Sequence, residues 1–299
     1  MSKAYSTILP MDTDVKVVDQ FGWIPLSVLE PTRESKAKWS VAYIDQLESE
    51  KRRSDDAEYL SGLGMSEFHA GLCEDIVRYW SLPGSRIVDP FMGRATRAVV
   101  STMLKRDYYG FEISPSTYKR VVEHINTLSL TPTLYNSDGC AMTEIEDNFA
   151  DLVMTCPPYW NIEKYESVQG QLSDCNSYLS FLSFIEICAR NIYRVLKPGA
   201  FCCWVCADFR GLKGEGLLPF HSDTIRLFKE QGLILHDIII IKNQSPFAAL
   251  QVGKVAAKRY TSKIHEYLLV FRKPGEYIIP DYCGKNEHVS KASTFFSWS

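Results

Sequence analysis

The stretch Arg86-Ile87-Val88-Asp89-Pro90-Phe91-Met92-Gly93-Arg94-Ala95-Thr96 predicts how this chain folds. It reads as a short apolar strand that ends in an acidic residue, a tight turn that contains Gly93, and a helix that runs on to Leu104. A strand, a glycine turn and a helix in this order bring backbone close to a ligand and point the helix N-terminus at it. A second strand ends at Glu112, at roughly the twenty-residue spacing from the glycine at which a carboxylate binds ribose hydroxyls in nucleotide-binding folds.

Strands and helices continue to alternate along the chain. The predicted strands cover residues 86–89, 108–112, 133–135, 151–155 and 201–207. The predicted helices cover residues 72–80, 95–104, 115–127, 178–195 and 222–231. This alternation predicts a parallel sheet. Two further β-rich runs, 233–242 and 265–272, have no helix between them, so they must pair antiparallel, because a parallel pair needs a long crossover.

A second motif, Thr155-Cys156-Pro157-Pro158-Tyr159-Trp160, follows the fourth predicted strand. Its two prolines remove two backbone donors and force extended geometry on the residue before each. The result is a stiff elbow whose carbonyls no local N–H can reach, with an aromatic ring directly after it. Such a carbonyl cradle beside a ring suits an enzyme that grips a planar base by its exocyclic amine. The alternative is a plain Pro-Pro turn that ends a strand.

Composition narrows the class of protein. The 299 residues suffice for one large α/β domain, alone or with an appendage. A net charge of −3 excludes a generically basic nucleic-acid binder, so any DNA contact must be local. We expect no membrane span and no signal peptide, because no apolar run reaches that length. Nine scattered cysteines favour reduced thiols in a cytoplasm.

Three of these cysteines lie in Phe201-Cys202-Cys203-Trp204-Val205-Cys206, which reads as a buried strand. Alternation places Cys202 and Cys206 on one face and Cys203 on the other. No His or Cys pair stands nearby at zinc-site spacing. We therefore interpret all three as small buried hydrophobic residues and predict no metal site.

The two motifs resemble those of a known family. Asp89-Pro90-Phe91-Met92-Gly93 and Cys156-Pro157-Pro158-Tyr159 are similar to the cofactor and catalytic motifs of S-adenosylmethionine-dependent DNA amino-methyltransferases, which methylate adenine-N6 or cytosine-N4. The closer resemblance is to compact phage and prophage methylases. Further matching stretches are Phe21–Leu29, Glu67-Phe68-His69, Val195–Gly199 and Lys263–Phe271. Two residues depart from the family pattern: Arg94 replaces a frequent second glycine, and Cys156 stands where Asp, Asn or Ser usually precedes Pro-Pro.

The resemblance implies a class I methyltransferase (Rossmann-like) fold, an α/β architecture with a seven-stranded, mostly parallel sheet and a C-terminal antiparallel hairpin. The patterns along the chain predict a poorly periodic N-terminal appendage over residues 1–64, a methyltransferase domain over 65–279 and a loose C-terminal tail over 280–299. The implied cofactor is S-adenosylmethionine, and the implied partner is DNA, with no membrane; a homodimer stays open. The implied setting is the cytoplasm of a bacterial host, in restriction–modification, with a phage or prophage origin.

The resemblance also assigns cofactor-binding residues, namely Phe68, His69, Asp89, Phe91, Gly93, Thr96, Glu112, Ile113 and Asp138. The first of these segments, around Phe68, would close over the methionine end of the cofactor, and the Asp89 turn would line it. Glu112 would accept the ribose hydroxyls, and Asp138 the adenine amine, with Ile113 against the ring. The alternatives are a solvent-exposed acid at Glu112, a turn residue at Asp138 and an ordinary helix-start residue at His69.

The catalytic residues implied by the resemblance are Thr155, Cys156, Pro157, Pro158 and Tyr159. The carbonyl of Pro157 would accept one proton of the base amine. Because the sulfur of Cys156 is a weak acceptor, Thr155 or a backbone carbonyl would compensate. Tyr159 would stack on a base flipped out of the duplex. A covalent role for Cys156, as in pyrimidine C5-methyltransferases, is the less favoured alternative, because no activating partner is evident.

A basic, amide-rich connection between the last two strands is the predicted DNA contact. Its cations are Lys254, Lys258, Arg259 and Lys263. An ordinary solvated loop is the alternative, in which case DNA would run over the segment around Lys51, Arg52 and Arg53. Two rival functions stay open: methylation of RNA or a small molecule on the same fold, and a non-catalytic DNA-binding protein with a decayed site.

Overall fold

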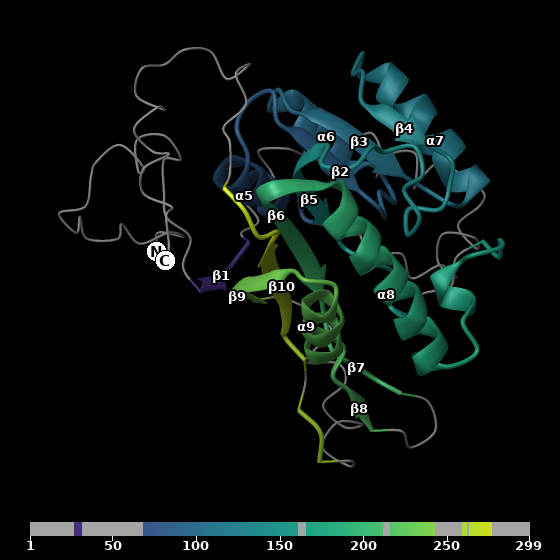
Figure 1. Ribbon diagram of the computed structural model, residues 1–299. Coiled ribbons are helices and arrows are strands. Elements are labelled where there is room, and N and C mark those ends of the chain that lie inside the picture. Colours follow the sequence, from purple (N-terminus) through teal and green to yellow (C-terminus); the bar gives the residue numbers. More distant parts are fainter. Residues whose placement is uncertain are drawn as a thin grey trace, which may run out of the picture.

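A single large sheet organises the part of the chain that the computed structural model describes, which is residues 27–31, 68–160, 166–211, 216–242, 259–261 and 263–276. Eight strands join in the order β1-β9-β10-β6-β5-β2-β3-β4 (Figure 1). Their bounds are β1 Val28–Leu29, β2 Arg86–Asp89, β3 Asp107–Phe111, β4 Thr133–Tyr135, β5 Ala150–Thr155, β6 Leu196–Cys206, β9 Ile234–Lys242 and β10 His265–Arg272. A separate small hairpin pairs β7 (Phe209–Arg210) with β8 (Leu217–Leu218).

Helices cover both faces of the sheet (Figure 1). One face packs against α5 (Ala70–Trp80), α6 (Thr96–Met103) and α7 (Pro115–Thr127). The other packs against α8 (Tyr178–Val195) and α9 (Phe220–Glu230), and a short 3-10 turn, η3, covers Leu172–Asp174. Both faces bury apolar side chains, so the central strands read as continuous hydrophobic runs, as expected for a parallel sheet between two helix layers. None of the described helices is long and apolar enough to cross a membrane.

Side-chain caps set where several helices begin. Ser114 accepts the N–H of Thr117, and Pro115 occupies the first helical position of α7, where a missing N–H costs nothing. Ser177 caps α8 in the same way by accepting the N–H of Ser180. These two helices begin and end where the sequence predicts.

The predicted sheet is confirmed, with two differences. β2, β3, β4, β5 and β6 run parallel, and β10 runs antiparallel to both β6 and β9. β6 begins at Leu196, five residues before the prediction, because Gly199 takes a φ of 77° and lets the chain pass Pro198 within the strand.

The eighth strand was not predicted. β1 pairs parallel with β9, with Val28 opposite Ile240, and Ile240 donates its N–H to the Ser27 carbonyl at 2.8 Å. Two residues are too few to show the alternation by which a strand is recognised in sequence. Part of the predicted N-terminal appendage therefore belongs to the central sheet, while the domain boundaries at 64/65 and 279/280 lie outside the described residues and stay predictions.

The cysteines of β6 alternate as predicted. Cys202 and Cys206 pack in the cluster under α8 and α9, and Cys203 packs in the cluster under α5 and α6. Burial raises the pKa of all three thiols well above the ordinary value, so they stay protonated. Within the described part of the chain, no group of three or more His, Cys, Asp or Glu side chains could hold a metal ion.

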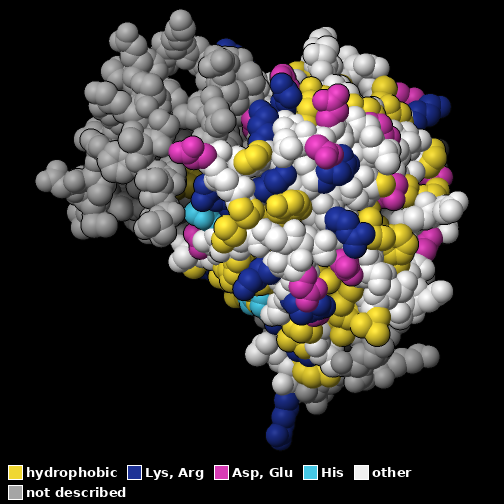
Figure 2. Space-filling view, viewed as in Figure 1, with side chains coloured by type: hydrophobic (Ala, Val, Ile, Leu, Met, Phe, Trp, Pro, Cys, Tyr) yellow, Lys and Arg dark blue, Asp and Glu magenta, His cyan; other side chains and the backbone are white. Residues whose placement is uncertain are grey.

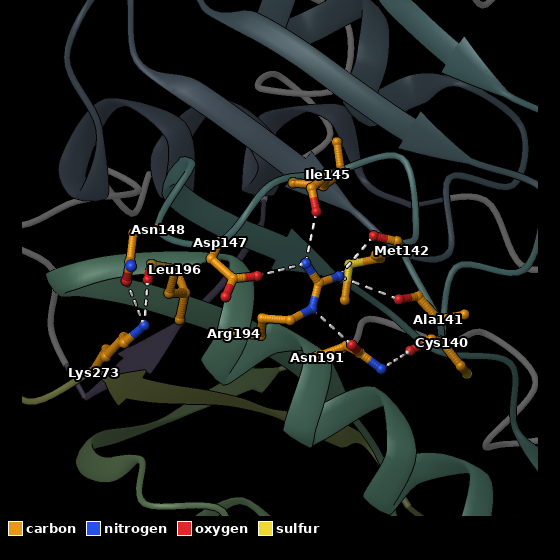
Figure 3. Close-up of polar contacts among 10 residues, drawn as sticks. All are labelled: Cys140, Ala141, Met142, Ile145, Asp147, Asn148, Asn191, Arg194, Leu196 and Lys273. Atoms are coloured by element: carbon orange, nitrogen blue, oxygen red, sulfur yellow. Dashed lines mark hydrogen bonds and ion pairs between the residues drawn. The ribbon is translucent and has the colours of Figure 1, made fainter.

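A polar network joins the helix layer to the sheet at the amino edge of β5 and β6 (Figure 3). The guanidinium of Arg194, at the end of α8, donates to the carbonyls of Ile145 and Met142, both at 2.7 Å, and forms an ion pair with Asp147 at 3.1 Å. Met142 has a φ of 45°, a strained value that these bonds help to hold. Arg194 therefore fixes the loop that enters β5.

We expect Arg194→Met to lower the free energy of unfolding by about 1.5–3 kcal/mol, because two carbonyls lose charged donors. Urea denaturation followed by circular dichroism measures this change. Arg226→Met is the matched control, since Arg226 is exposed on α9 and forms its ion pairs with Asp223 and Glu230 of the same helix. That control should change stability by less than about 0.5 kcal/mol, and equal losses in the two variants would contradict the role of Arg194.

Candidate active site

The loops that follow four parallel strands meet at one edge of the sheet. Backbone bonds hold them together: Met92 donates its N–H to the Phe111 carbonyl at 2.9 Å, and Glu112 donates its own to the Tyr135 carbonyl at 3.0 Å. Asn136 adds a side-chain bond to the Glu112 carbonyl at 2.8 Å. The segments that begin at Asp89, Glu112, Asn136 and Cys156 therefore form one surface at the carboxyl edge, where open α/β sheets bind ligands.

The carboxylate of Asp89, at the end of β2, is the centre of this edge. It is fully buried and accepts four groups that come from four different segments. Arg97 of α6 forms an ion pair with it at 2.7 Å, and the hydroxyl of Tyr108 of β3 donates at 2.6 Å. The Phe91 N–H donates at 3.1 Å, and the Thr155 hydroxyl of β5 donates at 2.6 Å. A buried charge is stable only when it is paired and hydrogen-bonded to this extent.

The partners of Asp89 are held in the protonation states that the network needs. Burial lowers the pKa of Arg97, but the charge of Asp89, the hydrogen bond to it and the neighbouring Tyr108 together outweigh burial and raise the pKa above its ordinary value. Burial and then the Asp89 charge raise the pKa of Tyr108 well above its ordinary value, so the phenol remains a donor. Arg97 also lies over the ring of Phe68, 4.8 Å from its centroid, and donates to the Phe91 carbonyl.

One predicted catalytic side chain, that of Thr155, belongs to this network. The side chain of Thr155 is fully buried, and its hydroxyl donates inward to Asp89. The Thr155 hydroxyl thus uses its proton within the network, and its role as a substitute for the weak acceptor at Cys156 stays a prediction, with a backbone carbonyl as the alternative. The Asp89 carboxylate that accepts this hydroxyl lies at the end of β2, the strand next to β5 in the sheet.

Glu112 faces the glycine turn from the end of β3. Its carboxylate accepts the backbone N–H of Ser114 at 2.8 Å and that of Gly93. Gly93 has a φ of +58° and Ala95 one of 73°, so the turn doubles back tightly before α6. The pKa of Glu112 is raised to about 7: burial raises it most, the two N–H groups oppose that rise, and the charges of Asp89 and Glu166 add to it. The predicted ribose acceptor is thus half-buried and titrates near neutrality.

Two further predicted cofactor residues, Asp138 and His69, form hydrogen bonds within their own turn or helix start. A Cβ on Gly139 would lie 1.8 Å from the Pro90 carbonyl oxygen, so only glycine lets these two loops touch. Asp138 accepts the Cys140 N–H at 2.8 Å, which is the bond of a turn residue. His69 caps α5 by accepting the Leu72 N–H at 3.3 Å. The structural alternatives for Asp138 and His69 are thus realised, and binding roles for them stay predictions.

The Pro-Pro elbow lies at the end of β5 with an aromatic wall beside it. The Tyr159 hydroxyl is 4.0 Å from the Cys156 sulfur and donates to Glu266 of β10 at 3.3 Å. The ring of Phe209 lies 6.3 Å from that of Tyr159, centroid to centroid. The Cys156 sulfur and the Glu266 carboxylate thus both lie near the phenol oxygen of Tyr159.

Four polar residues of this edge are not among the predicted catalytic or cofactor-binding residues: Arg97, Tyr108, Glu166 and Glu266. Arg97 could have been found, because it is an isolated cation in the first turn of an otherwise uncharged helix. At the start of α7, the hydroxyls of Ser114 and Ser116 and the backbone N–H of Ser116 all donate to the Glu166 carboxylate, at 2.5–3.2 Å. These bonds lower the pKa of Glu166 and join the segment after the elbow to the start of α7, which follows Glu112.

Two of the four residues predicted to contact DNA lie in the described part of the chain. Arg259 and Lys263 are exposed just before β10, whereas Lys254 and Lys258 lie outside the described residues. A further cation joins them: the guanidinium of Arg210, on β7, lies 3.6 Å from the centroid of the Tyr260 ring. The β7–β8 hairpin therefore contacts the connection that enters β10.

The residues at this edge fit a nucleoside cofactor such as S-adenosylmethionine. Glu112 offers a carboxylate beside a glycine turn where backbone can approach a ligand closely. The hydroxyl of Thr96, at the start of α6, is buried and has no hydrogen-bond partner among the residues that the structure describes. Buried polar groups are normally paired, so Thr96 is a candidate ligand contact.

Strand order, the reversed β10 and a site at the carboxyl edge define a class I methyltransferase fold. The chain belongs to the N6/N4 family of DNA methylases, whose family model matches residues 15–123 and 150–296. Membership confirms the resemblance carried by the two motifs, and with it an amino-type DNA methyltransferase family whose cofactor is S-adenosylmethionine.

Individual relatives are similar over part of their length. A type II methyltransferase of Methanothermobacter thermautotrophicus is 27% identical over 164 residues, 50% of this chain and 46% of that protein. One of Methanocaldococcus jannaschii is 30% identical over 162 residues, 46% and 54% of the two chains. This chain thus spans about half the length of these relatives. Among solved structures, TrmN from Thermus thermophilus has a TM-score of 0.47 at 13% identity, over 69% of this chain and 49% of that chain.

The titration of Glu112 predicts a pH-dependent cofactor affinity. The carboxyl titrates at a pKa of about 7 in the protein alone, and ribose hydroxyls donate to its ionised form. Binding of S-adenosylmethionine should therefore tighten as pH rises, by about tenfold between pH 6 and pH 8. Isothermal titration calorimetry measures this change. Glu112→Gln should bind more weakly with no such dependence, and a flat profile in the unsubstituted protein would contradict the ribose role.

Proposed function

We propose that the protein transfers the methyl group of S-adenosylmethionine to the exocyclic amine of adenine or cytosine in DNA. The observation that carries this proposal is the Pro157-Pro158-Tyr159 elbow at the end of β5, one strand away from the Asp89 turn and at the same edge. Family membership supports the reaction class. A bacterial cytoplasm and a phage or prophage origin belong to the same proposal, and a homodimer stays a prediction.

The elbow's part in this proposal is to hold the amine. When bound, S-adenosylmethionine supplies a methyl group that its sulfonium already activates. The obstacle is then the nitrogen lone pair, which is delocalised into the base. The Pro157 carbonyl accepts one amine proton and favours a pyramidal nitrogen with its lone pair free. Tyr159 stacks on the flipped base, a contact that contributes on the order of 1–3 kcal/mol.

Some of the predicted cofactor residues contact S-adenosylmethionine in this proposal, and others position the residues that do. Glu112 accepts the ribose hydroxyls, and Thr96, Phe91 and Gly93 line the methionine side. Asp89 acts through its network rather than by touching the cofactor, because four protein groups already occupy its carboxylate. Phe68 closes the same side through its contact with Arg97.

DNA approaches over the connection before β10 in this proposal. Arg259, Lys263 and the Arg210–Tyr260 pair lie at the catalytic edge. The face covered by α8 and α9 shows cations and acids interspersed rather than a basic patch (Figure 2), and such a surface does not favour a polyanion. Local cations at the edge therefore account for binding by a chain of net charge −3.

Expression in a methylation-free bacterial host, followed by single-molecule sequencing, tests the reaction. We expect modified adenine or cytosine at one recurring sequence, and none with Tyr159→Ala, which removes the stacking ring. Purified protein should methylate duplex DNA in preference to RNA and to free nucleotides. Methylation of RNA alone, or binding of DNA without any transfer, would replace the proposal with one of its two rivals.

The DNA path has its own test. Arg259→Ala with Lys263→Ala should weaken DNA binding at low salt and flatten the log–log salt dependence by about one for each lost phosphate contact. Fluorescence anisotropy over a salt series measures the slope. Lys119→Ala with Lys229→Ala removes the same charge from exposed positions on α7 and α9 and should leave the slope unchanged. Equal slopes in both double variants would exclude this path.

A further inference from the structure

We infer that Glu266 is a second acceptor for the base amine and takes the place of the acceptor that Cys156 cannot provide. The inference rests on the proposed function, since it assigns a residue to the same reaction. It starts from one juxtaposition: the Glu266 carboxylate and the Cys156 sulfur both approach the hydroxyl of Tyr159, at 3.3 Å and 4.0 Å from the oxygen.

Reversal of β10 is what brings Glu266 to the catalytic edge. Trp204 of β6 lies opposite Thr155 of β5, and Cys206 lies opposite Tyr267 of β10. The parallel strands end at this level, whereas the antiparallel β10 begins there. The first residues of β10 therefore stand beside the elbow, and Glu266 is half-buried in that position.

The chemistry favours the carboxylate over the thiol. A cysteine sulfur is a weak acceptor, whereas a carboxylate has two oxygens with about four lone-pair sites and accepts bonds roughly twice as strong as neutral ones. The phenol of Tyr159 uses one of those sites. A negative charge next to the amine also stabilises the positive charge that nitrogen gains as it is methylated. The Pro157 carbonyl and Glu266 together supply two acceptors, one for each amine proton.

Glu266 could instead act only by positioning Tyr159, and the two roles predict different results. If Glu266 accepts from the base, Tyr159→Phe keeps the stacking ring and releases the carboxylate, so methylation continues. If Glu266 works through the phenol, Tyr159→Phe and Glu266→Gln must lose the same amount of activity.

The test measures single-turnover methylation of duplex DNA by wild type, Glu266→Gln, Tyr159→Phe and Cys156→Ser, and by the double variant Cys156→Ser with Glu266→Gln. We expect Glu266→Gln to slow transfer about a hundredfold. A serine hydroxyl restores an acceptor before Pro-Pro, so the same change in the Cys156→Ser background should cost about tenfold or less. Glu230→Gln, which alters an exposed carboxylate of α9, should leave the rate unchanged.

Binding supplies a second readout. With S-adenosylhomocysteine present, wild type should bind a duplex that carries the target base more tightly than one whose target base lacks the amine. Glu266→Gln should narrow that difference by about tenfold, with cofactor affinity and thermal unfolding unchanged.

Three outcomes would overturn the inference. They are an unaltered rate in Glu266→Gln, an equal loss from Glu266→Gln in the wild-type and Cys156→Ser backgrounds, and an equal loss in Tyr159→Phe. A wild-type protein that methylates no DNA at all would instead overturn the proposed function, and the role of Glu266 with it. Wild-type activity thus separates failure of the inference from failure of the function.

Discussion

The buried carboxylate of Asp89 is the constraint on which the catalytic edge depends. One fully buried charge joins the ends of β2, β3 and β5 to the start of α6 through Tyr108, Thr155 and Arg97. Removal of any one partner would leave a buried charge less than fully paired, which is among the most costly defects in a folded protein. The turn at Gly93 and the elbow at Pro157 are therefore held relative to each other by this charge as well as by the sheet.

Three acidic side chains at this edge, Asp89, Glu112 and Glu166, have different surroundings. Asp89 forms an ion pair with the buried Arg97. Burial raises the pKa of Glu112 into the neutral range, although two backbone N–H groups oppose that rise. Hydroxyls at the start of α7 lower the pKa of Glu166 and keep it ionised. The three carboxylates of this edge thus differ in burial and in hydrogen-bond partners, and the pKa values of Glu112 and Glu166 shift in opposite directions.

Sequence patterns predicted the fold well where the physical signal is local and repeated. Pro115 after Ser114, and Ser177 before an apolar-periodic run, mark the starts of α7 and α8 to the residue. Antiparallel pairing of β9 and β10 followed from the missing crossover helix. β1 was missed because two residues carry no period, and the early start of β6 was missed because Pro198 and Gly199 read as a stop.

By itself the sequence determined the fold class, the family and which loops meet at the catalytic edge, because strand–helix alternation and two short motifs are local properties of the chain. Only the tertiary structure decided what the side chains in those loops do. It turned Thr155 inward to Asp89, placed Arg97 and Tyr108 around the same charge, and brought Glu266 from β10 to the elbow. These contacts join residues between 8 and 107 positions apart along the chain. Their energies depend on burial and on shared partners, which no local pattern encodes.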